Sequence, residues 1–194
     1  MQVPHAKIPA MLLLLLTASQ SHADWALDGS ASSFFYVTNK AAAVAEINSF
    51  SGLSGGISDK GQASLVIDLA TVSTAVDIRD QRMRELVFQV ANFPAATISV
   101  DVDAEALDSM SPGVSTTGSY TAQVALHGVT QELMADLQIT RLQDNSVLVQ
   151  VARPLIVNAA TFGLQAGVDE LQKLAALPSI NPNVVIDFTL VYRK

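Results

Sequence analysis

One short motif in this sequence has the residues of a hydrolase nucleophile. Gly52-Leu53-Ser54-Gly55-Gly56 matches the G-x-S-x-G elbow, which needs a strand before the serine and a helix after it so that the hydroxyl projects. Here another strand is expected after Ser54, and the base available to activate it would be His127. Glycine-rich turns between strands often produce the same string. The sequence therefore favours a hairpin turn at this point and leaves a serine hydrolase as a less favoured alternative.

Metal and thiol chemistry have few candidate residues. The chain has no cysteine and three histidines, which excludes a thiolate zinc site, an iron–sulfur cluster, a cysteine nucleophile and a disulfide framework. His127 alone makes a poor transition-metal site, and we expect it to face solvent or to cap an element. The acidic residues Asp101, Asp103, Glu105 and Asp108 lack the glycine-turned loop of a calcium-binding EF-hand, so we expect them on a solvated strand face. No metal or cofactor is predicted.

The charge balance restricts the class of partner. The chain of 194 residues has 18 acidic and 11 basic residues, a formal net charge of −7. Without a basic field or a run of lysine and arginine, neither nucleic acid nor an anionic membrane surface is an expected partner.

The first 23 residues have the pattern of a secretory signal. Lys7 gives a short positive region, an apolar run follows over Met11 to Leu16, and Ser21-His22-Ala23 places small residues at the −3 and −1 positions. The apolar stretch is well short of the roughly 20 residues that span a bilayer. We therefore expect cleavage before Asp24 and export of residues 24–194, with no membrane-spanning segment.

Most of the remaining chain alternates between apolar and polar residues with a period of two. This alternation predicts about eight strands, over residues 34–38, 46–53, 62–69, 97–103, 120–126, 133–139, 147–151 and 184–192. The spacing is typical of one all-β domain, an antiparallel barrel or sandwich. An eight-stranded barrel has room for side chains or for one small ligand, and packing density on general grounds favours a filled interior.

Two segments break this period and predict short helices. Residues 77–90 place apolar side chains at spacings of three and four, with Asp77 or Thr74 as the N-cap and Pro94 beyond the end. Residues 167–177 do the same before Pro178 and lie between the last two strands. This second helix is expected to cover or reshape one end of the barrel.

Several motifs, in order along the chain, resemble the YceI-like family over essentially residues 25–192. They are Trp25-Ala26-Leu27-Asp28, Phe50-Ser51-Gly52-Leu53-Ser54-Gly55, Thr71-Val72-Ser73-Thr74 before Ile78-Arg79-Asp80-Gln81-Arg82-Met83-Arg84, then Phe88, Phe93-Pro94, Gly128-Val129-Thr130 and Phe162-Gly163-Leu164. The resemblance implies a single lipocalin-like, extended antiparallel β-barrel in the bacterial periplasm. It also implies a hydrophobic tunnel for a long-chain amphiphile, such as a polyisoprenoid, an isoprenoid quinone or a fatty-acid derivative, and no reaction.

The resemblance and the aromatic residues together predict a binding site. Its expected residues are the aromatic walls Phe34, Tyr36, Phe50, Phe88 and Phe93, with Arg79 and Asp80 near one mouth, where they either meet a ligand head group or form ion pairs local to their helix. Family members often carry a histidine where this chain has Thr38-Asn39-Lys40 and an acidic residue where it has Ala160-Thr161, so head-group contacts cannot be transferred from those positions.

The alternative function is that of a closed barrel, a stress or interaction protein acting through its surface. Both a monomer and a homodimer remain open.

Overall fold

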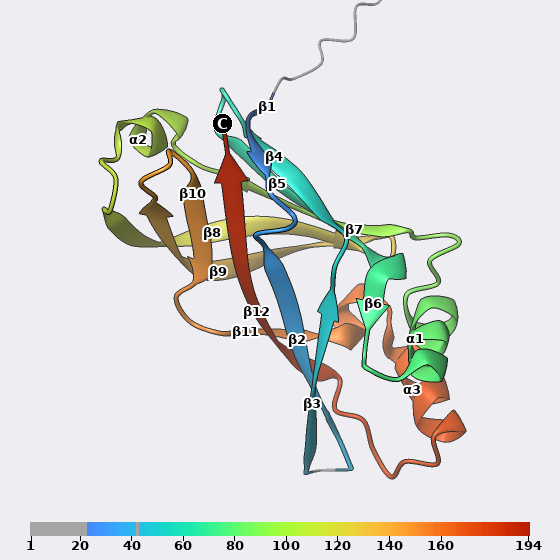
Figure 1. The fold of residues 1–194 in the computed structure, drawn as a ribbon. Coiled ribbons are helices and arrows are strands. Elements are labelled where there is room, and N and C mark those ends of the chain that lie inside the picture. The colour runs from blue at the N-terminus through green and yellow to red at the C-terminus, as the bar shows by residue number, and fades with distance from the viewer. Residues whose placement is uncertain (1–22, 42) are drawn as a thin grey trace, which may run out of the picture.

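The strands of this protein form one antiparallel sheet that closes on itself (Figure 1). The computed structural model describes residues 23–41 and 43–194, so residues 1–22 of the predicted signal sequence lie outside the described residues. The strands are β1 (Ala23–Leu27), β2 (Ser33–Lys40), β3 (Val44–Phe50), β4 (Leu53–Ser58), β5 (Gln62–Asp68), β6 (Val72–Ser73), β7 (Ala95–Asp101), β8 (Ser115–Leu126), β9 (Val129–Arg141), β10 (Val147–Val151), β11 (Leu155–Asn158) and β12 (Asn183–Arg193).

Several strands are interrupted, and we call each continuous or interrupted strand of the barrel a stave. The eight staves are β1 with β2, β3 with β4, β5 with β6, β7, β8, β9, β10 with β11, and β12. Strands β3 and β4 follow each other with two residues between them, and a short 3-10 turn, η1 (Leu69–Thr71), joins β5 to β6. The pairs β1 with β2 and β10 with β11 lie along successive parts of β12 on its two sides. Each stave is therefore adjacent to the next one along the chain, and β12 closes the barrel against β1 and β2. The predicted all-β antiparallel barrel is confirmed.

The long last strand shows how the alternating sequence produces an inside and an outside. In β12, Val184, Ile186, Phe188, Leu190 and Tyr192 all face the barrel interior, as the period of two predicts. Ile98, Val100 and Val102 do the same on and just after β7. The hairpin predicted around residues 143–145 is also formed, because β9 pairs with β10 from Arg141 and Val147 onward.

Two helical segments pack on one another at one end of the barrel (Figure 1). Helix α1 (Asp77–Arg82) continues into a π-helical turn, η2 (Met83–Val87), and α3 (Gln165–Leu174) crosses it. A Cβ atom added to Gly167 would stand 2.4 Å from the Leu86 carbonyl oxygen, so this close crossing requires glycine. Both predicted helices are confirmed in position. The predicted N-cap is wrong, because Val76 occupies the cap position without a side-chain hydrogen bond.

Two further elements differ from the sequence-based expectation. A third helix, α2 (Ala104–Ser109), begins at Asp103, whose carboxylate accepts a hydrogen bond of 2.9 Å from the Ala106 amide; Asp103 is therefore an N-cap and not a residue of a solvated strand. The predicted turn at residues 52–56 is instead the start of β4. Gly55 allows β4 to approach β5, since a Cβ atom there would lie 2.2 Å from the Ser64 carbonyl oxygen.

Within residues 23–41 and 43–194, no helix has the length and apolar character that crossing a membrane requires.

Candidate functional site

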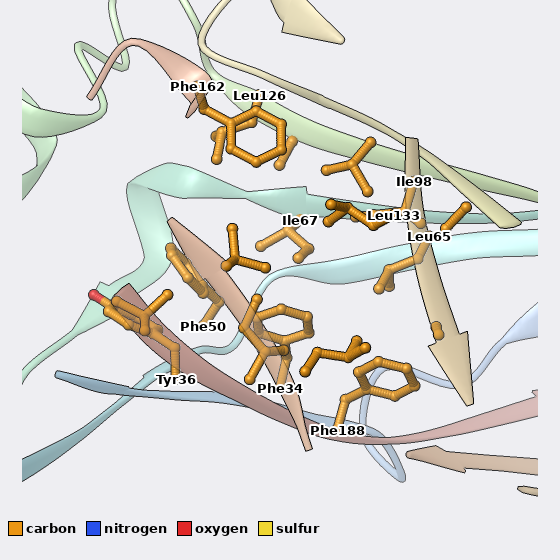
Figure 2. A pocket seen from close by; sticks show the side chains of 18 of the residues that line it. Phe34, Tyr36, Phe50, Leu65, Ile67, Ile98, Leu126, Leu133, Phe162 and Phe188 are labelled. Atoms are coloured by element: carbon orange, nitrogen blue, oxygen red, sulfur yellow. The ribbon is translucent and has the colours of Figure 1, made fainter. Parts of the chain in front are cut away.

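The inward faces of the barrel enclose a cavity of about 280 Å³. Its walls come from every stave of the barrel and from the two packed helical segments. Figure 2 labels lining residues of β2, β3, β5, β7, β8, β9 and β12. Within the described part of the chain, none of its lining residues is charged. The polar lining residues are Tyr36, Thr38, Ser64, Tyr120, Asn181 and Tyr192. A cavity of this size and lining, close to the lower end of the range of small-molecule sites, suits an apolar ligand.

The cavity is long for its volume. Along β12 its lining runs from Val184 to Tyr192, eight steps of about 3.3 Å, or about 26 Å along the strand. Strands in barrels tilt by about 35–45°, which leaves about 20 Å along the barrel axis. Half the hydrocarbon core of a bilayer is about 15 Å. The cavity is therefore longer than the path of an ordinary acyl chain from the membrane surface to the midplane.

Four of the five predicted aromatic wall residues line this cavity and contact one another. Phe50 is the centre of the group, with ring centroids 6.2 Å from Phe34, 5.5 Å from Tyr36 and 5.6 Å from Phe88. Phe34 also stacks on Phe188 at 6.1 Å, and Figure 2 shows this row of rings along one wall. Phe188 was not among the predicted site residues, although the alternation of β12 already placed it on the inner face.

Phe93 does not line the cavity. Its ring packs against His127, with 4.4 Å between the ring centroids, at the turn between β8 and β9. His127 is half-buried there, and its Nε2 atom is buried without a hydrogen-bond partner. The expectation that His127 faces solvent or caps an element is therefore wrong. Phe162, which the site prediction also left out, lines the cavity instead and is fully buried.

Charged residues gather where the inner faces of β2 and β3 extend beyond the aromatic wall. Lys40 Nζ lies 2.7 Å from Glu46 Oε1, and Arg79 Nη1 of α1 donates to Glu46 Oε2 at 2.8 Å. The Asp80 carboxylate accepts hydrogen bonds from the amide and hydroxyl of Thr74, with 2.7 Å to the amide. We call Lys40, Glu46, Arg79 and Asp80 the mouth cluster. The ion-pair partner of Arg79 lies on β3 and not on its own helix, and its Nη2 atom also donates to the Thr74 carbonyl oxygen. Neither Arg79 nor Asp80 lines the cavity itself.

The mouth cluster affects the pKa values of groups at its end of the cavity. Burial alone would raise the pKa of Glu46, but hydrogen bonds from Lys40 and Arg79 outweigh it and hold that pKa below its usual value. Burial, helped by the negative charge of Asp80 and opposed by the positive charge of Arg79, raises the pKa of Tyr36. The Tyr36 hydroxyl is thus near both charges and stays protonated at every physiological pH.

The opposite end of the barrel is closed by stacked side chains. Trp25 is 2% exposed, and two cations lie over its ring, the Arg141 guanidinium at 4.5 Å from the ring centroid and the Lys194 ammonium at 4.9 Å. Arg141 itself is 7% exposed, whereas Lys40, Glu46 and Arg79 at the other end are 26–28% exposed. Trp25 and Arg141 therefore fill this end of the barrel, and the Lys194 side chain beside them stays 42% exposed.

Ser54 lies in a setting that differs from a nucleophile elbow. It is an exposed residue of β4, which turns into β5 rather than into a helix, as expected from the sequence. His127 packs against Phe93, and no hydrogen bond joins it to Ser54 among the described residues. Residues 23–41 and 43–194 also contain no cluster of three or more histidine, cysteine or acidic side chains that could hold a metal ion.

This chain is similar to known proteins in both sequence and structure. Residues 25–192 match the model of the YceI-like domain. A polyisoprenoid binding domain from Saccharophagus degradans, implicated in plant cell wall breakdown, is 38% identical over 89% of this chain and 99% of that chain, with a TM-score of 0.87.

More distant structures share the fold. BcnA from Burkholderia cenocepacia is 16% identical over 85% of this chain and 98% of its own, with a TM-score of 0.65. The YCEI protein of Campylobacter jejuni is 13% identical over 76% and 84%, with a TM-score of 0.53. No curated protein sequence matches this chain.

Proposed function

Because this chain belongs to the YceI-like family, we propose that it is a periplasmic binding or carrier protein that encloses the tail of one long-chain apolar ligand in its barrel. The observation that carries this proposal is the long cavity lined mainly by apolar side chains and by no charged side chain among the described residues. Its relative from Saccharophagus degradans is a polyisoprenoid binding domain, which supports a ligand of the same kind here.

The hydrophobic effect supplies enough free energy for tight binding. Each buried methylene contributes about 0.8 kcal/mol, so ten of them contribute about 8 kcal/mol before the cost of ordering the ligand. The cavity accommodates an extended tail, and the polyisoprenoid binding relative favours a polyisoprenoid or isoprenoid-quinone tail over a fatty-acid derivative. The tail would lie against Phe34, Tyr36, Phe50 and Phe88, with its head group toward Arg79 and Asp80.

The predicted export is consistent with the same function. The predicted signal sequence before Asp24 would deliver the chain to the periplasm, between two membranes that contain such lipids. In that compartment a protein that shields an apolar tail from water can carry it from one membrane to the other. The cavity argues against the alternative of a closed barrel that acts through its surface.

Native mass spectrometry of the protein extracted from the periplasm tests this proposal. We expect the polypeptide mass plus one lipid, and extraction with organic solvent should release that lipid and leave the polypeptide mass alone. A bare polypeptide that also fails to bind an isoprenoid quinone or a long-chain fatty acid on incubation would contradict the proposal.

A further inference from the structure

A second hollow of about 250 Å³ lies beneath helix α2, beside the main cavity. Helix α2 forms one of its walls, and the first half of β8 and the end of β9 form the others. Four side chains line both spaces, namely Val102, Leu107, Tyr120 and Ile139. The two spaces therefore share a wall, and together they offer nearly twice the volume of the main cavity.

The hollow lies where the far end of a bound tail would point. A ligand with its head group toward Arg79 and Asp80 directs its tail away from α1 and α3, and Figure 1 shows α2 at that opposite end of the barrel. Trp25 and Arg141 fill the barrel end itself. Because the main cavity is about 20 Å long along the barrel axis, a longer tail needs further space, and the hollow beside Leu107 adjoins the cavity at this end.

Few contacts hold α2 on the barrel. Leu107, 5% exposed, is the one buried side chain among residues 103–112. Within the part of the chain that the structure describes, the hydrogen bonds of residues 103–112 stay inside residues 103–114. In the same part of the chain, one ion pair reaches the helix from outside, between Lys194 Nζ and Asp108 Oδ1 at 2.7 Å, and both side chains are more than 40% exposed. A segment with so few buried contacts opens at a lower free energy than the strands around it.

The two ends of this segment are anchored and can act as hinges. The Val102 amide donates to the Gly61 carbonyl oxygen at 2.7 Å, and the Gly113 amide donates to the Arg141 carbonyl oxygen at 2.7 Å. Gly113 has a φ of 86°, a left-handed conformation that glycine adopts readily. The residues between these two anchors can therefore move outward while β7 and β8 keep their pairing.

We propose that this hollow receives the far end of a tail that is longer than the main cavity, and that α2 is the movable cover that admits it. Leu107 lies in the wall between the two spaces. When α2 moves outward, Leu107 leaves that wall and the tail passes beneath the helix. The protein then binds tails of different lengths with one position for the head group. This inference rests on the proposed function, because it concerns the tail of the same ligand.

Two alcohols that differ only in the number of isoprene units distinguish the two spaces. An extended chain advances about 1.2 Å per bond, so the 11 chain bonds of farnesol span about 13 Å and the 23 chain bonds of hexaprenol span about 28 Å. Farnesol fits within the main cavity, whereas hexaprenol exceeds it by about 8 Å. The partition of each tritiated alcohol between the delipidated protein and phosphatidylcholine vesicles gives the affinity of every variant relative to the wild type.

The variant Thr116→Trp fills the hollow from one side. Thr116 is exposed and lines the hollow but not the main cavity. If the indole displaces about two to four methylene groups of the tail, hexaprenol binding weakens roughly 15- to 200-fold, while farnesol binding stays within about twofold. Thr117→Trp is the matched control, because Thr117 is also exposed and lies on the other face of β8. It should bind both alcohols as the wild type does.

A cross-link between α2 and the last residue of the chain tests whether the cover moves. The chain has no cysteine, so Asp108→Cys with Lys194→Cys provides one pair of thiols, both at exposed positions, for a short bismaleimide. Compared with the same variant before cross-linking, hexaprenol binding should weaken by about tenfold or more, the loss of about two buried methylene groups. Farnesol binding should not change. The control is Glu170→Cys with Lys173→Cys, which carries the same cross-link across an exposed ion pair of α3 and should change neither affinity.

The outcomes distinguish this inference from the proposed function. A wild-type protein that takes up neither alcohol from the vesicles contradicts the proposed function itself. Unchanged hexaprenol binding by Thr116→Trp, or an equal loss of farnesol and hexaprenol binding, overturns the assignment of the hollow alone. Hexaprenol binding that survives the cross-link between positions 108 and 194 overturns the role of α2 as a movable cover.

Discussion

Filling the cavity with a side chain should remove the ligand without unfolding the protein. Ala122 on β8 is 6% exposed, lines the cavity, and pairs with Leu133 on β9 and Val100 on β7. The variant Ala122→Trp would place an indole ring in the space that we assign to the tail. If the ring displaces about four methylene groups at about 0.8 kcal/mol each, binding weakens by about 3 kcal/mol, more than a hundredfold in Kd.

The melting temperature of the ligand-free protein distinguishes an open cavity from a filled core. An indole entering open space should leave this temperature nearly unchanged. Overpacking a filled core costs about 1–3 kcal/mol, which lowers the melting temperature by roughly 2–12 °C in a protein of this size. Native mass spectrometry for lipid content and calorimetry of the delipidated protein measure the two effects separately.

The neighbouring position supplies the control. Thr121 precedes Ala122 on β8 but is exposed and points to the outside of the barrel, so Thr121→Trp should retain both the ligand and the stability. If several inward variants of the Ala122→Trp type all lose stability and none changes the lipid content, the reasoning that leads from the cavity to a carrier is wrong.

Three more predictions follow from particular residues. The mature protein should begin at Asp24, and an intact mass that still includes residues 1–23 would refute this. Ser54→Ala should leave ligand binding and the melting temperature unchanged, whereas loss of an esterase activity in a folded variant would restore the hydrolase alternative. Hydrogen bonds from a neighbouring serine and from Arg193 lower the pKa of Asp28 to about 2. A serine close to Asp144 and the same Arg193 lower the pKa of Asp144 to about 2 as well. In the unfolded chain the pKa of an aspartate is about 3.9. Both contributions to stability are therefore present above about pH 4 and are lost as the pH falls toward 2. Urea unfolding measures the free energy of unfolding at pH 5 and at pH 2, and the decrease between them should be smaller in Arg193→Gln than in the wild type. An equal decrease would contradict the role of Arg193 in lowering these two pKa values.

Local pattern made much of the fold readable from the sequence. The side chains of a strand alternate between two faces whatever the rest of the chain does, so the inner residues of β12 and β7 follow from the order of residues alone. The same holds for the two helices that break this period. The aromatic wall was predictable for the same reason, since Phe34 and Tyr36 share one face of β2 and Phe50 faces them from β3.

Elements with short or mixed patterns were not predictable in this way. Helix α2 occupies six residues, too few for a helical period to show, and its acidic cap Asp103 continues the alternation of β7. Strand β4 was mistaken for a turn because glycines mark turns in most sequences, and here they permit the close approach of β5. Phe93 was assigned to the wall from its place in the motif, but the chain leaves the barrel interior before it and packs it on His127.

The sequence by itself determined the strands, their inner faces and the aromatic residues available for a lumen, because these depend on the geometry of neighbouring residues along one strand. Only the tertiary structure decided that the barrel encloses a cavity, that Trp25 and Arg141 close one end, and that Arg79 meets Glu46 across 33 positions of the chain. Each of these depends on how the staves are spaced when the barrel closes. Alternation along a strand fixes which way a side chain points, but not the distance to the side chain that faces it.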